Sequence, residues 1–380
     1  MKILSIIFFT LIYSNISFSN DLELEELLNK INLPDGFKIS IYANNIENAR
    51  SMSISPSGTV FVGNRKADNV FALKDIDGDG KVDKKYLITD KLKNMPNGVS
   101  YHEGDLYVAE VNKIWLFKDV EDNLKKYDEV GFYPEDPILI SDEFPSDKHH
   151  GWKYISVGPD NKLYVPVGAP CNICESRDEI YSHMTRMDLV DTYLEIFARG
   201  VRNTVGFTWH PETGEMWFTD NGRDMLGDNY PPCELNRISK PNEHYGYPYC
   251  HGGNISDPEF GLKYPCDDFI KPVQNLGPHV APLGVKFYNG NMFPEEYRGD
   301  VFIAEHGSWN RTKKIGYRIT RVKIDGNKSL GYEPFIYGWL EKDKNDAWGR
   351  PVDLVFLVDG SMLISDDYAN VIYRVTYDKG

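Results

Sequence analysis

A short phrase recurs six times along this chain: a turn built on Gly or Asn is followed by an alternating run of β-forming residues. The copies occupy residues 56–62, 103–108, 159–165, 213–218, 298–303 and 359–364. Several are followed, after a polar gap, by a second apolar run, as at 70–73, 114–117 and 371–375. Units that repeat every roughly 45–60 residues stack, because none can bury its apolar face alone. Six units predict an all-β fold: a six-bladed β-propeller of four-stranded antiparallel blades, with its ligand site at one mouth of a central channel.

The length and net charge of the chain limit the number of domains and the kinds of binding partner that we expect. The chain has 380 residues, and no Pro/Ser-rich linker or low-complexity tract divides it. We therefore expect a single propeller domain over residues 20–380, with its longest excursion between blades at about 225–295. The net charge of −15 argues against nucleic acid or an anionic membrane surface as a partner, since both require a basic face.

The first residues have the pattern of a secretory signal peptide. Met1 and Lys2 precede an apolar run over 3–12, and Ser17-Phe18-Ser19 places small residues at the positions that a signal peptidase reads. A membrane anchor is disfavoured because the run is too short to cross a bilayer. The sequence predicts a signal peptide over 1–19 and a periplasmic or secreted protein without an integral membrane segment.

The cysteines fit that oxidising setting. They are Cys171, Cys174, Cys233, Cys250 and Cys266. Cys171 and Cys174 form a CxxC pair, but no second CxxC completes a zinc cage. Structural disulfides are therefore the favoured interpretation. We expect Cys171–Cys174 and Cys250–Cys266, with Cys233 free, although the sequence alone leaves other pairings open.

One acidic loop resembles the start of an EF-hand. Asp75, Asp77, Asp79 and Asp83 stand where such a loop places oxygen ligands, with Gly where the sharp turn falls. Tyr86 occupies the position of the bidentate Glu, which is therefore missing. The loop is either a weak calcium site or a solvated acidic hairpin.

Polar clusters lie in the loops that precede or follow the repeated strands. They occupy 149–152, 199–206, 220–224, 306–311 and 348–353. A propeller brings equivalent ends of its blades together, so His, Arg, Asn and acidic groups from separate blades would meet at one mouth. Each group alone also has an ordinary structural explanation, as a loop histidine or an ion-paired arginine. Their joint occurrence favours a site for a polar or anionic ligand.

These segments resemble the glucose/sorbosone dehydrogenase family, whose members are exported six-bladed propellers that use pyrroloquinoline quinone (PQQ) and calcium. The similarity runs from about Leu33 to Tyr377. It is carried by 197–203 and 217–224 and, for the L-sorbosone dehydrogenase branch, by 277–284, 306–311, 349–353 and 359–375. The resemblance implies an oxidoreductase that transfers hydride from a small-molecule sugar or sugar aldehyde to C5 of the quinone. An external electron acceptor would reoxidise the cofactor.

The resemblance also implies roles for individual residues. His150 matches the general base, and a neutral imidazole with a pKa near the working pH suits that task. Arg202 and Asn203 match the groups at the quinone oxygens, where Arg202 would stabilise developing charge. Arg350 matches an Arg that pairs with the cofactor's carboxylates. Two further cofactor candidates lie on the loop where relatives place a Lys: His306 and Arg311.

Two calcium sites follow from the same resemblance. Backbone carbonyls of Gly222 and Arg223 match the ligands of the catalytic calcium, which would also polarise the quinone carbonyl. Glu234 and Tyr245 match positions that hold a second, structural calcium in some relatives.

The chain departs from the glucose-oxidising branch at four positions. Val205 stands for a cofactor-contacting Gln, and Val352 for a second cofactor Arg. Ala169 replaces an Asp that orients the base, and Arg223 replaces a Pro. These changes argue against glucose as the substrate.

Two other functions remain open from the sequence. A calcium-dependent sugar lactonase on a similar scaffold would need carboxylates and Asn as direct metal ligands, for which Asp220, Asn221 and Asp224 are available. A non-catalytic carbohydrate-binding propeller would need none of the catalytic groups.

Overall fold

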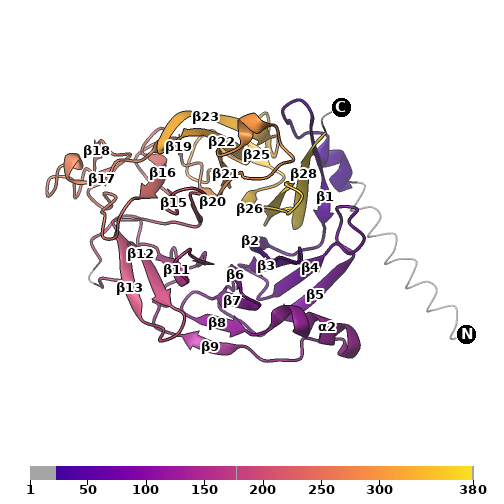
Figure 1. Ribbon diagram of the computed structural model, residues 1–380. Helices are drawn as coiled ribbons and strands as arrows, with labels where there is room; N and C mark the ends of the chain where they lie inside the picture. The colour runs from indigo at the N-terminus through magenta and orange to yellow at the C-terminus, as the bar shows by residue number, and fades with distance from the viewer. Residues whose placement is uncertain (1–22, 177, 379–380) are drawn as a thin grey trace, which may run out of the picture.

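The strands form six four-stranded antiparallel sheets arranged in a ring (Figure 1). This computed structural model describes residues 23–176 and 178–378. The six-bladed β-propeller predicted from the repeated phrase is thereby confirmed. The predicted signal peptide over 1–19 lies outside the described residues.

Each blade is named here by its strands, starting from the innermost one. Blade 1 has β2 (Ala49–Ile54), β3 (Val60–Asn64), β4 (Val70–Lys74) and β5 (Lys84–Thr89); blade 2 has β6 (Gly98–His102), β7 (Asp105–Ala109), β8 (Ile114–Phe117) and β9 (Ile138–Ser141); blade 3 has β10 (Ser156–Val157), β11 (Lys162–Val167), β12 (His183–Asp188) and β13 (Leu194–Arg199). Blade 4 has β14 (Phe207–Trp209), β15 (Met216–Asp220), β16 (Pro232–Ile238) and β19 (Gln274–Pro278); blade 5 has β20 (Pro282–Phe287), β21 (Val301–Glu305), β22 (Arg318–Asp325) and β23 (Lys328–Tyr337); blade 6 has β26 (Pro351–Phe356), β27 (Met362–Asp366), β28 (Val371–Tyr377) and β1 (Phe37–Ala43).

The remaining helical segments and short hairpins lie outside the four-stranded blades. The helix α2 (Val120–Val130) lies between β8 and β9 in the chain, and it packs Val120 and Leu124 into the core of blades 1 and 2. Residues 23–28 are also helical, and two short hairpins and two 3-10 turns are present: β17 (Cys250–His251) with β18 (Ile255–Ser256), β24 (Leu340–Glu341) with β25 (Asp346–Ala347), η1 (Cys266–Asp268) and η2 (Glu295–Tyr297). No helix in the described part of the chain is long and apolar enough to cross a membrane.

The repeated phrase corresponds to the second strand of each blade. Strands β3, β15, β21 and β27 are buried along their whole length. A strand buried on both faces is typically a continuous apolar run rather than a strict alternation. The runs are apolar because each blade packs both of its faces against a neighbouring blade.

The N-terminal strand closes the ring. Strand β1 pairs with β28, the third strand of blade 6, so the first described strand completes the last blade (Figure 1). Phe37, at the start of β1, makes edge-to-face contacts with Phe293, Tyr297, Phe335 and Tyr377, with ring centroids 4.8–5.3 Å apart. This closing strand belongs to no copy of the repeated phrase, so the repeat pattern did not predict it.

We expect Phe37→Ala to lower the free energy of unfolding by about 3 kcal/mol or more, because it removes a buried ring from the contact between β1 and blade 5. Urea unfolding followed by tryptophan fluorescence would measure the change. The control is Lys38→Ala, whose side chain is 68% exposed. An equal effect of both substitutions would show that closure does not depend on Phe37.

Candidate active site

A cavity of about 320 Å³ lies where the inner strands begin. Polar residues stand at or just before the start of these strands: Arg50 on β2, His150 before β10, Arg202 before β14 and Arg350 before β26. All four line the cavity. Its other walls come from Arg65, Trp152, Asn203, Asn221, Gly222, Asp224, Cys233, His279, Ala281, Leu283, His306, Gly307, Trp309 and Tyr317. The structure thus brings six predicted site residues together: His150, Arg202, Asn203, Gly222, His306 and Arg350.

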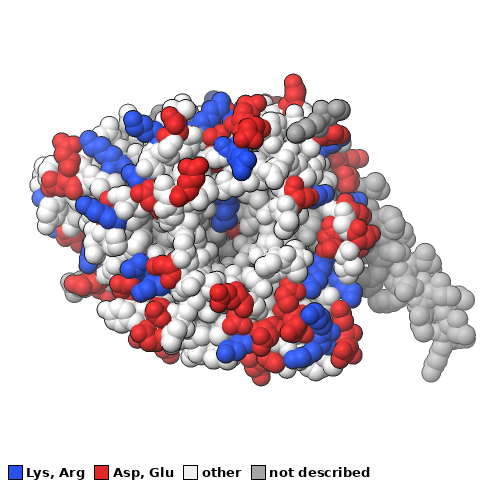
Figure 2. All heavy atoms as spheres, in the orientation of Figure 1, with Lys and Arg blue, Asp and Glu red and all other residues white. Residues whose placement is uncertain are grey.

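The cavity is cationic, although the protein carries a net charge of −15. Four arginines line it, whereas Asp224 is the one carboxylate among its described lining residues. Figure 2 shows Lys or Arg atoms within the central hollow, while most acidic atoms lie on the outer rim. A concentration of guanidinium groups inside an acidic protein favours an anionic ligand there.

Two of these guanidinium N–H groups make no hydrogen bond to a described residue. They are Nη2 of Arg50, which is 1% exposed, and Nε of Arg350, whose side chain is 30% exposed and whose Nε lies 3.4 Å from Asp367 in an ion pair. Arg65 lies with its guanidinium carbon 3.7 Å from the ring centre of Trp152. Burial, followed by the charge of Arg50, lowers the pKa of Arg65 to about 10. A buried donor without an acceptor costs free energy, which the oxygen atoms of a bound anion would recover.

Asp367 holds one side of the cavity together. Its Oδ2 accepts a hydrogen bond from Arg50 (2.9 Å), and its Oδ1 lies 3.0 Å from Nε2 of His306 and 3.4 Å from Nε of Arg350. Burial opposes ionisation of Asp367, but His306 and the two arginines hold its pKa well below the ordinary value. Asp367 therefore fixes three cavity groups while balancing only part of their charge.

Arg65 and Asp367 were missed by sequence reasoning. Each follows directly after the second strand of its blade, the place that Asn221 occupies after β15 and His306 after β21. Comparing this position in all six repeats would have found both residues.

His150 is held as a neutral base. Its Nδ1 donates to the carbonyl of Ala169 (2.9 Å), which leaves the lone pair of Nε2 available on the cavity side. Burial, then Arg202 and His149, lowers the pKa of His150 to about 2, so the neutral form is as predicted but the predicted pKa near the working pH is wrong for this cavity. The sequence predicted the loss of an orienting Asp at position 169, and here the backbone carbonyl of Ala169 orients the imidazole instead.

Residue 168 is glycine because its backbone passes close to His150. A Cβ at Gly168 would lie 2.6 Å from Cβ of His150. His150 itself has a φ of 50°. The backbone thus has room for this imidazole orientation only with glycine at 168.

Arg202 is almost fully buried, with 4% exposure. Its guanidinium donates to the backbone O of Asn172 (2.9 Å), to Oδ1 of Asn172 (2.9 Å) and to the backbone O of Asn221 (3.1 Å). The carboxylate of Asp224 is 3.4 Å away. The three shorter contacts are to neutral acceptors, and Asp224 balances part of the charge of Arg202 through the longer one.

Asp220 braces the backbone of the same segment. Its two carboxylate oxygens accept from the backbone N–H groups of Arg202 (2.8 Å) and Asn203 (2.6 Å). Burial raises the pKa of Asp220 to about 6, although these N–H groups oppose the shift. Asp220 does not line the cationic cavity, which places it beneath the site rather than in it.

Two departures from the resembled family create an apolar floor. Val205 and Val352 pack with Leu283 and Trp152. Val205, Val352 and Leu283 are each at most 5% exposed. Leu283 and Trp152 also line the cavity. We call Val205, Leu283, Val352 and Trp152 the apolar floor, which reaches the cavity through Leu283 and Trp152.

The predicted calcium ligands lie in two places. Gly222 lines the cationic cavity next to Asn221 and Asp224, which add hard oxygen atoms of the kind that calcium prefers. The side chain of Arg223 points elsewhere, to Asp257 (2.5 Å) and Glu259 (3.2 Å). A role for Arg223 at a metal would therefore rest on its backbone alone.

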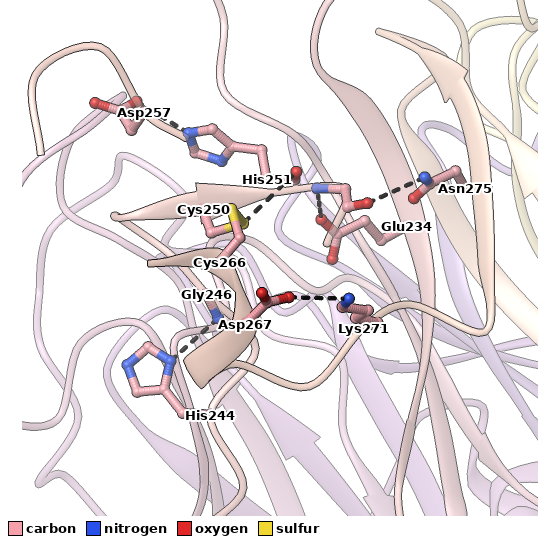
Figure 3. Close-up of a disulfide and its surroundings, with 11 residues drawn as sticks. Glu234, His244, Gly246, Cys250, His251, Asp257, Cys266, Asp267, Lys271 and Asn275 are labelled. Carbon is pink, nitrogen blue, oxygen red and sulfur yellow. Dashed lines mark hydrogen bonds and ion pairs between the residues drawn. A yellow bond between two sulfur atoms is a disulfide. The ribbon is translucent and has the colours of Figure 1, made fainter. Parts of the chain in front are cut away.

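Glu234 and Tyr245 line a second, much smaller cavity. Glu234 accepts hydrogen bonds from Gly252 (2.6 Å) and Asn236 (2.9 Å), and burial raises its pKa to about 7 (Figure 3). The hydroxyl of Tyr245 donates to the carbonyl of Arg237 (2.7 Å). A structural calcium here stays a prediction.

The other candidates lie outside the cationic cavity. Arg311 donates to the carbonyls of Asp228 and Lys313 and does not line the cavity. Carboxylate oxygens of Asp75, Asp77 and Asp83 come within 4.8 Å of one another, whereas Asp79 is not part of this group. Their oxygens accept from backbone N–H groups of the same loop. Calcium binding by this loop stays a prediction.

Both predicted disulfides are present. Cys171 is bonded to Cys174, and Cys250 of β17 is bonded to Cys266 of η1 (Figure 3). Cys233 is free and buried, as predicted, and it lines the cationic cavity.

Comparison with known proteins gives a family and a set of fold relatives. A family model described as "Domain of unknown function (DUF7133)" matches residues 23–376. An uncharacterized protein of Borreliella burgdorferi is 38% identical over 364 residues, which cover 93% of each chain. A pyrroloquinoline quinone-dependent pyranose dehydrogenase of Coprinopsis cinerea is 24% identical over 276 residues, 58% of this chain and 37% of that protein. This chain therefore matches well under half the length of that enzyme.

Solved structures share the propeller. The holo PQQ domain of the Coprinopsis cinerea pyranose dehydrogenase superposes with a TM-score of 0.76 at 18% identity, covering 91% of this chain and 97% of that one. A calcium structure of a Trichoderma reesei family AA12 enzyme gives 0.76 at 19% identity, with 92% and 97% coverage. The PQQ-bound aldose sugar dehydrogenase of Streptomyces coelicolor gives 0.60 at 17%, with 91% and 100% coverage. The predicted likeness to PQQ-dependent sugar dehydrogenases is confirmed for the fold, and the sorbosone branch stays a prediction.

The low pKa of His150 makes the stability of the protein depend on pH. Below pH 6.5, the ordinary pKa of the group, the unfolded chain binds a proton that the native imidazole does not take up until about pH 2. Stability present above pH 6.5 is therefore lost as the pH falls. Between pH 7.5 and pH 5.0 we expect the wild type to lose about 2 kcal/mol more unfolding free energy than His150→Gln. Urea titrations at both pH values measure this, and equal losses would contradict the neutral assignment.

Proposed function

This chain belongs to the DUF7133 family, and we propose that it is an exported PQQ- and calcium-dependent dehydrogenase of a sugar or sugar aldehyde. One observation carries the proposal: a cationic cavity with unsatisfied guanidinium N–H groups is lined by a neutral histidine, His150, whose Nε2 makes no hydrogen bond to any described residue. Arg50, Arg65 and Arg350 offer donors for carboxylates, and PQQ is a planar polycarboxylate. The site therefore suits such a cofactor in both charge and hydrogen bonding.

Some of the cavity residues would bind the cofactor's carboxylates, and others would contact its quinone oxygens. Arg50, Arg65 and Arg350 would hold the cofactor's carboxylates, and Arg202 with Asn203 would contact its quinone oxygens. Bound there, PQQ supplies an electrophilic carbonyl carbon that accepts hydride from the substrate. The backbone carbonyls of Gly222 and Arg223 would supply calcium with hard oxygen ligands.

His150 supplies the base. Its Nε2 takes the proton of the substrate hydroxyl as the hydride leaves the adjoining carbon, so the C–H and O–H bonds are replaced by a carbonyl. The Nδ1–H···O bond to Ala169 holds the ring during this transfer and stabilises the imidazolium that forms. The buried charge of Arg202 lies nearby and stabilises negative charge that develops on an oxygen.

The lactonase alternative is less well supported. It needs Asp220, Asn221 and Asp224 together as metal ligands, but both oxygens of Asp220 accept from backbone N–H groups outside the cavity. A non-catalytic binding propeller would have no use for a buried imidazole with an open Nε2. We also propose a periplasmic or secreted location, an external electron acceptor and a sorbosone- or aldose-like substrate.

The first test is a titration of the metal-stripped protein with PQQ, with and without calcium, followed by the cofactor's absorbance. We expect calcium-dependent binding, and Arg65→Leu should weaken it about tenfold or more, because each charge-assisted hydrogen bond is worth about 1.5–3 kcal/mol. Arg298→Leu is the matched control, since Arg298 is 53% exposed and does not line the cavity. Absence of binding under both conditions would refute the proposed function.

The base is tested by turnover. His150→Gln should retain PQQ binding and lose dye-linked sugar oxidation by about 10²–10⁴-fold, the range of a general base. His149→Gln is the control, because His149 is exposed and lies beside His150 outside the cavity lining. Unchanged turnover in His150→Gln would assign the proton transfer to another group.

A further inference from the structure

The Cys171–Cys174 disulfide closes a short loop that reaches the cavity. Asn172, the residue after the first cysteine, accepts two hydrogen bonds from Arg202: Nε donates to its backbone O and Nη2 to its Oδ1, both at 2.9 Å. This is a fork-like contact of the kind that a carboxylate makes with Arg. Asn172 makes it without adding negative charge.

Asn172 also fixes the segment on the other side of Arg202. Its Oδ1 accepts from the backbone N–H of Asp224 (2.8 Å), and its Nδ2 donates to the backbone O of Asp224 (3.0 Å). One amide side chain therefore sets the distance between Arg202 and the stretch that holds Asn221, Gly222 and Asp224. The quinone-contacting and calcium-binding groups of the proposed function lie on these two segments.

Few other contacts hold this loop. Within the described part of the chain, residues 170–176 lie in no strand or helix and make no backbone–backbone hydrogen bond. Apart from the contacts of Asn172, the anchors on its side of the loop are the disulfide and the hydroxyl of Tyr247, which accepts from the N–H of Cys174 (3.1 Å) and lies 3.4 Å from Sγ of Cys171. Beyond the bridge, Glu175 accepts from the hydroxyl of Tyr249 (2.8 Å) and from Lys263 (2.6 Å). Both cysteines are partly exposed, so a small reductant can reach the bridge.

We propose that Asn172 is a positioning residue for Arg202, and that the Cys171–Cys174 disulfide keeps Asn172 in place. Quinone affinity and turnover would then depend on the oxidation state of this bridge, a consequence that rests on the proposed function. Reduction by a dithiol breaks the S–S bond and gives two thiols, while the dithiol becomes a disulfide. The freed loop no longer holds Asn172 against Arg202.

The two disulfides of the chain give a matched comparison. The first bridges residues 3 apart and the second residues 16 apart. A short closed loop removes less chain entropy from the unfolded state than a longer one does. We therefore expect Cys171→Ser/Cys174→Ser to change the Tm less than Cys250→Ser/Cys266→Ser, but to reduce kcat by roughly tenfold or more, as loss of an orienting contact does. The Cys250→Ser/Cys266→Ser protein should keep its kcat once folded.

A readout that needs no quinone separates this inference from the proposed function. The Nε–H signal of Arg202 in a ¹H–¹⁵N spectrum, assigned by its absence in Arg202→Lys, reports the bond to Asn172. We expect slow solvent exchange in the wild type and in Cys250→Ser/Cys266→Ser. Fast exchange is expected in Cys171→Ser/Cys174→Ser and in wild type treated with dithiothreitol.

Two variants of Asn172 distinguish its role in positioning Arg202 from the effect of a negative charge at residue 172. Asn172→Ala keeps the backbone O that accepts from Nε of Arg202 but removes the Oδ1 that accepts from Nη2, so it should speed the exchange of the Nη2–H signal of Arg202. Asn172→Asp keeps both acceptor oxygens, so it should preserve slow exchange yet weaken PQQ binding by pairing the charge of Arg202. Unchanged exchange in the Cys171→Ser/Cys174→Ser and Asn172→Ala proteins would overturn the inference. A wild type that binds no PQQ but shows these exchange changes would refute the proposed function and leave the positioning role standing.

Discussion

Closure of the ring by β1 and β28 is the constraint on which the site depends. The cavity groups come from five blades, and their places in the sequence range from Arg50 to Arg350. No local interaction can bring such residues together. Their convergence follows because each inner strand begins at the same mouth once the pairing of β1 with β28 and the packing of Phe37 complete the circle. The geometry of the cavity therefore depends on the stability of the closing strand β1.

A second constraint is electrostatic. Burying arginines without matched carboxylates costs free energy, and this chain has 57 acidic residues with which it could have matched them. Instead, Asp367 is shared among Arg50, His306 and Arg350, and the shorter contacts of Arg202 are to neutral carbonyl and amide oxygens, with the carboxylate of Asp224 at 3.4 Å. Both arrangements fix the direction of a guanidinium while leaving positive charge for a ligand. Such incompletely satisfied polar groups are expected at functional sites rather than in a purely structural channel.

The sequence was informative where the signal is periodic or carried by a motif. The repeated phrase predicts the second strand of every blade, and the resemblance indicates His150, Arg202 and Arg350, which the structure brings into one cavity. Strand β1 was not predicted, because its register is set by pairing with a strand more than 300 residues away. Arg65, Asp367 and Asn172 were missed because their importance lies in contacts between blades or loops. Arg311 was placed at the cofactor by its loop alone, yet its guanidinium binds carbonyls of Asp228 and Lys313.

Two of the positions at which the resemblance implies a departure from the glucose-oxidising branch, 205 and 352, have the same structural consequence. The lost Arg at position 352 and the lost Gln at 205 leave valines that join Leu283 and Trp152 in the apolar floor. The positive charge that blade 6 lacks there is present on blade 1 instead, where Arg65 stacks on Trp152 of that same floor and Arg50 is held by Asp367. The cavity thus keeps its capacity for a polyanion while one wall changes from polar to apolar. Under the proposed function, the cofactor's carboxylates would turn toward Arg50 and Arg65 of blade 1, and the apolar floor would face its ring.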